Sequence, residues 1–133
     1  MIVPVTGVFA AVLGILLVLL SAHVVKFRLK YKKDIGVTED RDFQVAVRTH
    51  ANLVEYAPLG LIMLAIAELN GVASGLIYWT GMALVVGRIL HAWGMINGKG
   101  EAHKGRALGM VLTWLAILAA AVLLLWNVWH VYG

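Results

Sequence analysis

Four long apolar stretches dominate this chain of 133 residues and constrain its fold more than any other feature. Each stretch can cross the hydrocarbon core of a bilayer, which is about 30 Å thick and needs about 20 helical residues. The stretches lack the polar alternation of membrane β-barrel strands, and backbone groups in lipid must be hydrogen-bonded within the segment. The sequence therefore predicts an all-α membrane protein whose spans cover about residues 3–25, 45–69, 71–95 and 108–131.

The composition agrees with this class and leaves room for a single domain. Hydrophobic residues make up 62% of the chain and charged residues 14%, against about 45–50% and about 25% in soluble domains. Because four spans use most of the chain, we expect one up-down four-helix bundle over residues 1–133. The first stretch is too long for the apolar part of a signal peptide and has no charged segment before it, so we interpret it as a true span.

The positive charges predict the orientation of the chain in the membrane. All 11 Lys and Arg residues lie in two connections, about residues 26–43 and 96–106, or in the adjoining helix ends, and the connection over residues 68–75 has none. Basic connections face the cytoplasm under the positive-inside rule. We therefore expect both basic connections in the cytoplasm and both termini outside.

Polar residues within the spans indicate a binding site near the cytoplasmic face. In the second span Arg48, Asn52 and Glu55 share one helix face, although a charged group in a membrane costs at least about 2.5–3.5 kcal/mol near its centre. Arginine grips carboxylates in a bidentate manner, so such a site suits a small anionic ligand. We expect four arginines to gather around Asn52 and Glu55, namely Arg28, Arg48, Arg88 and Arg106.

Structural readings of these residues remain open alternatives. Arg88 could form an ion pair with Glu55 that only holds helices together, and Arg28 could be an ordinary cytoplasmic charge. The chain has no cysteine, and its histidines do not cluster, so no metal site is predicted. Glu68, at the outer end of the second span, is expected to be solvated. Six glycines in the spans are expected to serve ordinary helix packing without a GxxxG pair among them, namely Gly7, Gly14, Gly60, Gly81, Gly87 and Gly94.

The segment Arg48–Leu64, RTHANLVEYAPLGLIML, resembles the signature of the membrane-associated proteins in eicosanoid and glutathione metabolism. The pattern is matched at Arg48, Asn52, Glu55, Tyr56, Pro58 and Leu59. The resemblance covers essentially the whole chain and is closest to the short bacterial members. It implies a homotrimer in a bacterial inner membrane, with glutathione bound between subunits near the cytoplasmic face.

The resemblance also implies roles for individual residues. The glutathione contacts it implies are Arg48, Asn52, Glu55 and Tyr56 from the motif, Arg88 and His91 from the third helix and, most loosely, Arg28 from the first. Arg106, which opens the fourth helix, falls where relatives place an arginine near the thiol, and it is the predicted catalytic residue. Met95 and Ala107 stand where relatives often carry a tyrosine and a serine, so two hydroxyl groups that assist the thiol are missing.

The predicted function is that of a glutathione-dependent membrane transferase or peroxidase acting on lipophilic electrophiles. Its expected partners are glutathione, a lipophilic small molecule, the bilayer and further copies of the chain, with neither a metal nor nucleic acid. The alternative is a non-catalytic binding or scaffold protein of the same fold, because a fold does not guarantee an activity. A transporter is disfavoured because the chain has no inverted repeat.

Overall fold

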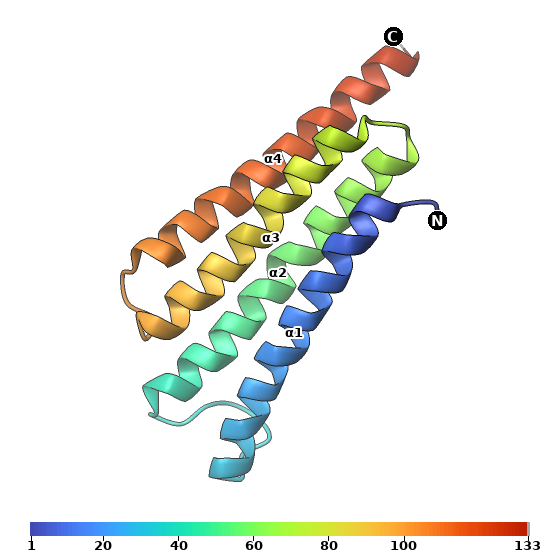
Figure 1. Ribbon diagram of the computed structural model, residues 1–133. Coiled ribbons are helices and arrows are strands. Elements are labelled where there is room, and N and C mark those ends of the chain that lie inside the picture. Colours follow the sequence, from blue (N-terminus) through green and yellow to red (C-terminus); the bar gives the residue numbers. More distant parts are fainter. Residues whose placement is uncertain (133) are drawn as a thin grey trace.

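The structure is a computed structural model that describes residues 1–132, with side chains through residue 130. It contains the helices α1 (Pro4–Tyr31), α2 (Arg41–Leu69), α3 (Ser74–Asn97) and α4 (Lys104–Tyr132) (Figure 1). No strand occurs within residues 1–132, and all four helices are long and apolar enough to cross a membrane. The all-α four-helix prediction is confirmed, while Gly133 of the predicted domain lies outside the described residues.

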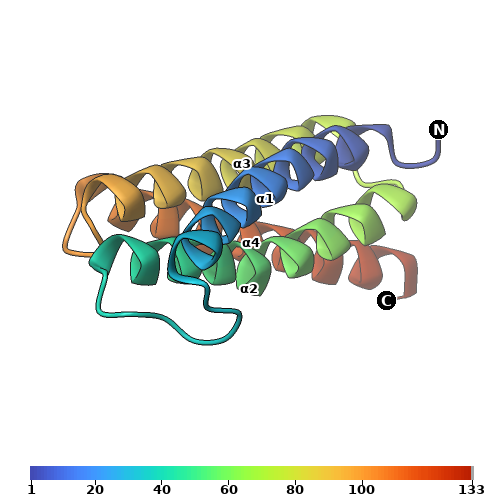
Figure 2. The ribbon, with the colours of Figure 1, turned by 90° about the horizontal axis from the view of Figure 1, so that it is seen from below.

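The helices run up and down, so that successive connections lie at opposite ends of the bundle. The two termini and the α2–α3 turn lie at one end, and the α1–α2 and α3–α4 loops lie at the other (Figures 1 and 2). We call the latter the basic end, because its two loops, residues 32–40 and 98–103, lie within the predicted basic connections, about residues 26–43 and 96–106, whose helix ends carry most of the Lys and Arg residues. That the basic end faces the cytoplasm stays a prediction.

At the basic end the helices continue past the predicted spans. Helix α1 runs to Tyr31 and α2 begins at Arg41, because charged side chains at these ends can reach water while the backbone stays helical. The carboxylate of Asp40 caps α2 by accepting from the backbone N–H groups of Asp42 at 2.8 Å and Phe43 at 3.3 Å. The hydroxyl of Tyr31 also donates to Asp40, and these hydrogen bonds, that of Tyr31 first, hold the pKa of Asp40 below its ordinary value.

At the opposite end, Glu68 caps the beginning of α1. Its carboxylate accepts from the backbone N–H groups of Val5 at 2.9 Å and Thr6 at 2.8 Å. The first N–H groups of a helix have no partner within the helix, and the positive end of the helix dipole favours an anion there. The expectation that Glu68 is merely solvated is therefore wrong, because chain topology brings the end of α2 to the start of α1.

Glycines set the tightest helix contact, between α3 and α4. A Cβ at Gly94 would lie 2.1 Å from the backbone N of Arg106, and one at Gly109 would lie 2.4 Å from the backbone N of His91. Gly105 and Gly109 form a GxxxG pair, the pattern that lets helix backbones approach closely. The expectation of no such pair rested on glycines inside the apolar spans and missed this one, because α4 begins at Lys104, before the predicted span.

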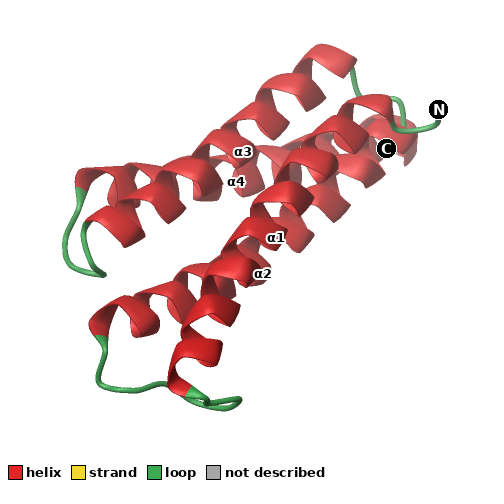
Figure 3. Ribbon diagram, turned by 60° about the horizontal axis from the view of Figure 1, so that its bottom comes forward, coloured by secondary structure: helices red, strands yellow, loops and turns green. Residues whose placement is uncertain are grey.

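The arrangement of the helices places the polar residues of α2 against α3 and α4. Helix α1 packs on α2 and α3, while α4 packs on α3 and α2, and within the described residues α1 and α4 do not contact each other. Buried apolar side chains such as Leu64, Ile77 and Leu84 fill the core. The α1–α2 and α3–α4 hairpins diverge toward the basic end (Figure 3).

Candidate ligand site at the basic end

Arg88 of α3 is a fully buried cation at the junction of three helices. Its side chain is 1% exposed. Its Nε donates to the Thr113 hydroxyl at 2.8 Å, and its Nη1 donates to Oδ1 of Asn52 at 2.7 Å. The guanidinium carbon lies 5.2 Å from the centre of the Tyr56 ring, close enough for a cation–π interaction. Arg88 therefore holds two residues of the α2 motif in place from inside the bundle.

Thr113 is a residue of this network that the sequence analysis did not single out. Its hydroxyl accepts from Arg88, donates to the carbonyl of Gly109 at 2.8 Å, and belongs to a wholly buried residue. The spacing did carry a signal, because Arg106, Met110 and Thr113 recur at i, i+4 and i+7 on one face of α4. A hydroxyl on the same helix face as a charged residue indicates a polar face on an otherwise apolar helix.

Arg48 and Glu55 form a bidentate ion pair along α2. Their two N–O distances are 2.8 and 3.2 Å, and the side chains are 59% and 46% exposed on the isolated chain. Glu55 thus pairs with Arg48, so the alternative of an Arg88–Glu55 ion pair is wrong. The physical reason is geometry, since Arg88 turns inward to Asn52 while Glu55 lies on the outer face of α2.

Beside this ion pair lies an apolar cavity of about 400 Å³ between α2 and α4. Glu55 and Tyr56 line it on the α2 side, and Trp114 and Leu118 line it on the α4 side. The α2 motif therefore presents a charged pair next to space suited to an apolar group. His91, one turn after Arg88 on α3, is buried where α3 packs closely against Gly109.

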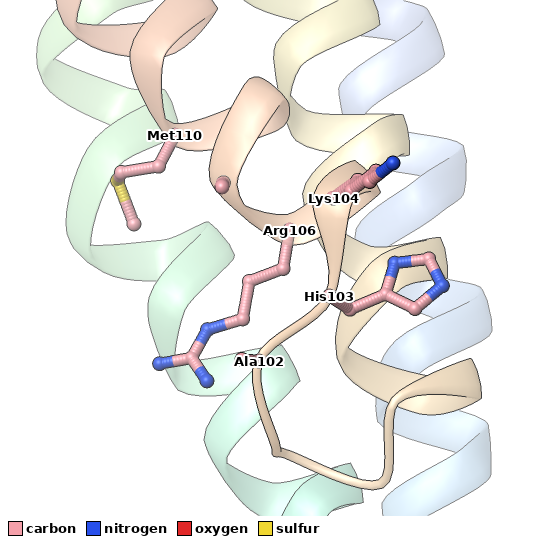
Figure 4. Close-up of a pocket in the computed structure, with 6 residues that line it drawn as sticks. Ala102, His103, Lys104, Arg106 and Met110 are labelled. Atoms are coloured by element: carbon pink, nitrogen blue, oxygen red, sulfur yellow. The ribbon is translucent and has the colours of Figure 1, made fainter.

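Arg106 lies at the start of α4 and reaches toward α2. Its Nη1 donates to the carbonyl of Gly100 at 2.9 Å. It borders a cavity of about 620 Å³ formed by residues 102–110, and Figure 4 shows its guanidinium pointing away from His103 and Lys104, toward α2. A second cavity of about 240 Å³ is lined by both Arg106 and Arg48. The structure thus brings together the predicted catalytic residue and a predicted ligand residue.

Within one chain, Arg28 lies apart from the other predicted site residues. Its Nη1 donates to carbonyls of the α1–α2 loop, including that of Lys33 at 3.3 Å, and its guanidinium lies 5.8 Å from the centre of the Phe43 ring. Together with His50 it lines a different cavity, of about 260 Å³, between α1 and α2. The expected gathering of four arginines around Asn52 and Glu55 is therefore wrong for a single subunit.

Comparison with known proteins finds two kinds of similarity. The model of the MAPEG family, the membrane-associated proteins in eicosanoid and glutathione metabolism, matches residues 6–126. This range contains every predicted site residue. The inner membrane protein YecN of Escherichia coli strain K12 is 30% identical over 126 residues, which are 95% of this chain and 92% of that protein. The protein of the same name from Escherichia coli O6:H1 matches to the same extent.

Proposed function

This chain belongs to the MAPEG family, and from that premise we propose that it is a glutathione-dependent enzyme of a bacterial inner membrane. It conjugates glutathione to lipophilic electrophiles or uses glutathione to reduce lipophilic peroxides. The family, which includes membrane glutathione transferases, supports the chemistry. The location of the Escherichia coli relative, an inner membrane protein by name, supports the inner membrane.

The observation that carries the proposal is the exposed Arg48–Glu55 pair. Glutathione has an ammonium group and two carboxylates, so Glu55 can take the ammonium and Arg48 a carboxylate. Exposed ion pairs contribute only about 0–1 kcal/mol. Exchanging this pair for two charges of the ligand therefore costs little, and the same side chains then make charge-assisted hydrogen bonds to the peptide.

Asn52 and Tyr56 support the same ligand from positions fixed by Arg88. Oδ1 of Asn52 accepts from Arg88, while its Nδ2 group has no partner among the described residues and is left to donate to a ligand. We assign Arg88 and His91 to the inner wall of the site. Arg88 acts through Asn52 and Tyr56, which it contacts from inside the bundle, and His91 is buried one turn further along α3.

Arg28 fits the proposal as a contribution from a neighbouring copy in a homotrimer. It lies on α1, which makes no contact with α4 in the described structure, and its guanidinium is engaged by the α1–α2 loop of its own chain. A site between subunits joins the Arg28 face of one copy to the Arg48–Glu55 face of the next. The proposed trimer therefore accounts for a residue that one subunit leaves apart.

We assign thiol activation to Arg106. A free thiol has a pKa of about 8.5 and is mostly protonated at pH 7, and a nearby guanidinium favours the thiolate. Lowering the thiol pKa by two units corresponds to about 2.7 kcal/mol of differential stabilisation. The thiolate sulfur then forms a C–S bond to the electrophilic carbon of a substrate that enters from the lipid through the apolar cavity between α2 and α4, and the bond to a leaving group such as chloride breaks, releasing that group as an anion.

A non-catalytic binding protein is the second candidate, and Met95 favours it. Met95 lines the cavity shared by Arg48 and Arg106, where relatives often carry a tyrosine whose hydroxyl assists the thiol. In this chain Arg106 acts without that hydroxyl. A protein that binds glutathione but does not activate it would keep every feature of the α2 motif.

Calorimetric titration of the detergent-solubilised protein with glutathione, followed by turnover of a chlorinated aromatic electrophile, tests both candidates. Binding with turnover is the result we expect. Binding without turnover would support the second candidate. Absence of glutathione binding in both detergent and lipid nanodiscs would contradict the proposed function.

A further inference from the structure

Two arginines from different helices converge on the α3–α4 loop. The Nε of Arg41, the first residue of α2, donates to the carbonyl of Lys99 at 2.8 Å, and Arg106 donates to the next carbonyl, that of Gly100, at 2.9 Å. Both loop residues have positive φ, 48° at Lys99 and 77° at Gly100. The loop backbone thus holds two guanidinium groups on the same side of the molecule.

These arginines border the cavity of about 240 Å³, which Arg48 and Gln44 also line. No carboxylate lines it. Within the described residues neither Arg41 nor Arg106 has an ion-pair partner, whereas Arg48 is paired with Glu55. The adjacent Asp40 does not neutralise Arg41, because its carboxylate is engaged by Tyr31 and the first turn of α2. The cavity therefore carries uncompensated positive charge.

The remaining donors of the two arginines suit an oxyanion. Arg41 uses only its Nε in the hydrogen bonds of the described structure, and Arg106 uses only its Nη1. Arginine presents its N–H groups in a planar fork that matches phosphate oxygens. A volume of 240 Å³ equals about eight water molecules, which accommodates a phosphate group and its remaining hydration.

We propose that Arg41 and Arg106 form a binding site for a phosphate group at the basic end of the bundle. The phosphate belongs either to a soluble phosphate compound or to the headgroup of an anionic lipid, since cationic pockets at this level of a bilayer attract such headgroups. The inference stands on the cavity and its charges and not on the proposed function. Arg41 lies outside the residues assigned to glutathione, whereas Arg106 is shared with the proposed thiol site, so phosphate and glutathione should compete for it.

The first test uses thermal unfolding of the protein in uncharged detergent, without glutathione, with inorganic phosphate replacing chloride at constant ionic strength. Phosphate should raise the Tm of the wild type. Arg41→Gln should need about tenfold more phosphate, or more, for the same rise in Tm, because it removes hydrogen bonds to a charged group. Lys26→Gln is the matched control, since it removes one exposed positive charge near the same end of the bundle. The Lys26 side chain makes no hydrogen bond or ion pair in the described structure.

The second arm replaces phosphate with lipid. Nanodiscs of phosphatidylcholine, with or without phosphatidylglycerol, hold the wild type and both variants. A rise in Tm that requires phosphatidylglycerol and is lost only in Arg41→Gln would also support the site and assign its phosphate to a lipid. Arg41→Lys keeps the charge without the fork and should respond weakly, which preserves the test if Arg41→Gln does not fold.

Equal responses of the wild type and Arg41→Gln to both probes would overturn the inference, as would no response of the wild type to either. Glutathione titration of the same variants separates this inference from the proposed function. A wild type that responds to phosphate but does not bind glutathione would count against the proposed function and leave the phosphate site standing.

Discussion

At the scale of single residues, the five arginines of this protein differ in burial: one is buried, two are half-buried and two are exposed. Arg88 is enclosed by neutral hydrogen-bond acceptors and an aromatic ring, while Arg48 and Arg41 face outward. A buried charge that loses an acceptor cannot turn to water, whereas an exposed one can. Substitutions around Arg88 should therefore affect stability, and substitutions around Arg48 should affect ligand binding.

Thr113→Val should lower the free energy of unfolding by about 1–3 kcal/mol, because it leaves the buried Nε of Arg88 without an acceptor. The measurement is denaturation by SDS in mixed micelles. Thr49→Val is the matched control, since the hydroxyl of the equally buried Thr49 bonds only to the Val45 carbonyl of its own helix. Equal losses in the two variants would show that the contact with Arg88 has no special weight.

Glu55→Gln should weaken glutathione binding by about 2–5 kcal/mol, the usual cost of losing one charged partner of a partly desolvated pair. Stability in SDS should change little, because the Arg48–Glu55 pair is exposed. Calorimetric titration measures the affinity. A variant that unfolds readily but binds glutathione as tightly as the wild type would mean that Glu55 has a structural role instead.

At the scale of elements, the helices were predictable from hydropathy, but the side-chain contacts between the helices were not. The apolar stretches indicate four spans because bilayer thickness sets their length. They do not show where α1 and α2 end beyond the lipid, where charged side chains are tolerated. Helix periodicity placed Arg48 and Glu55 on one face, yet the choice of Asn52 over Glu55 as the partner of Arg88 depends on distances between helices, which one sequence does not contain.

The cap of α1 by Glu68 is an interaction of this kind, and it can be tested. Glu68→Ala should lower the free energy of unfolding by about 1 kcal/mol, the typical cost of losing a helix cap. Glu68→Gln should cost less, because an amide oxygen still accepts one hydrogen bond. Glu39→Ala in the exposed part of the α1–α2 loop serves as the control. Equal losses in the free energy of unfolding for Glu68→Ala and Glu39→Ala, measured by SDS denaturation, would contradict the cap.

The cap of α2 by Asp40 predicts a pH dependence. The pKa of Asp40 is lowered in the folded protein, chiefly by the hydrogen bond from Tyr31, so the unfolded chain binds its proton first. The stabilisation is complete above the unfolded pKa of about 3.9 and is lost as pH falls through the lowered folded pKa.

Asp40→Asn should remove this part of the acid sensitivity, because an amide does not titrate in this range. The Tm of the wild type and the variant should therefore converge as pH falls. Asp34→Asn, in the same loop, should retain the wild-type slope. Parallel curves for the wild type and Asp40→Asn, from neutral pH to the acid limit, would show that Asp40 does not carry the effect.

At the scale of the whole molecule, the chain presents two separate cavities on different faces. The Arg48–Glu55 pair with its apolar cavity lies between α2 and α4, and Arg28 with His50 lies between α1 and α2. The motif of α2 was sufficient to predict the family, because its residues are close in sequence. How the faces meet depends on contacts between copies, and we propose that the trimer joins them around glutathione.

The most direct test of the account is the thiol pKa of bound glutathione, followed by the ultraviolet absorbance of the thiolate as pH is raised. In the wild type the thiol should ionise well below the value of about 8.5 for a free thiol. Arg106→Lys should raise this pKa partly, because it keeps the charge without the planar fork, and Arg106→Leu should raise it further while changing glutathione affinity much less. A bound thiol that ionises at the same pH in the wild type and in Arg106→Leu would contradict the account.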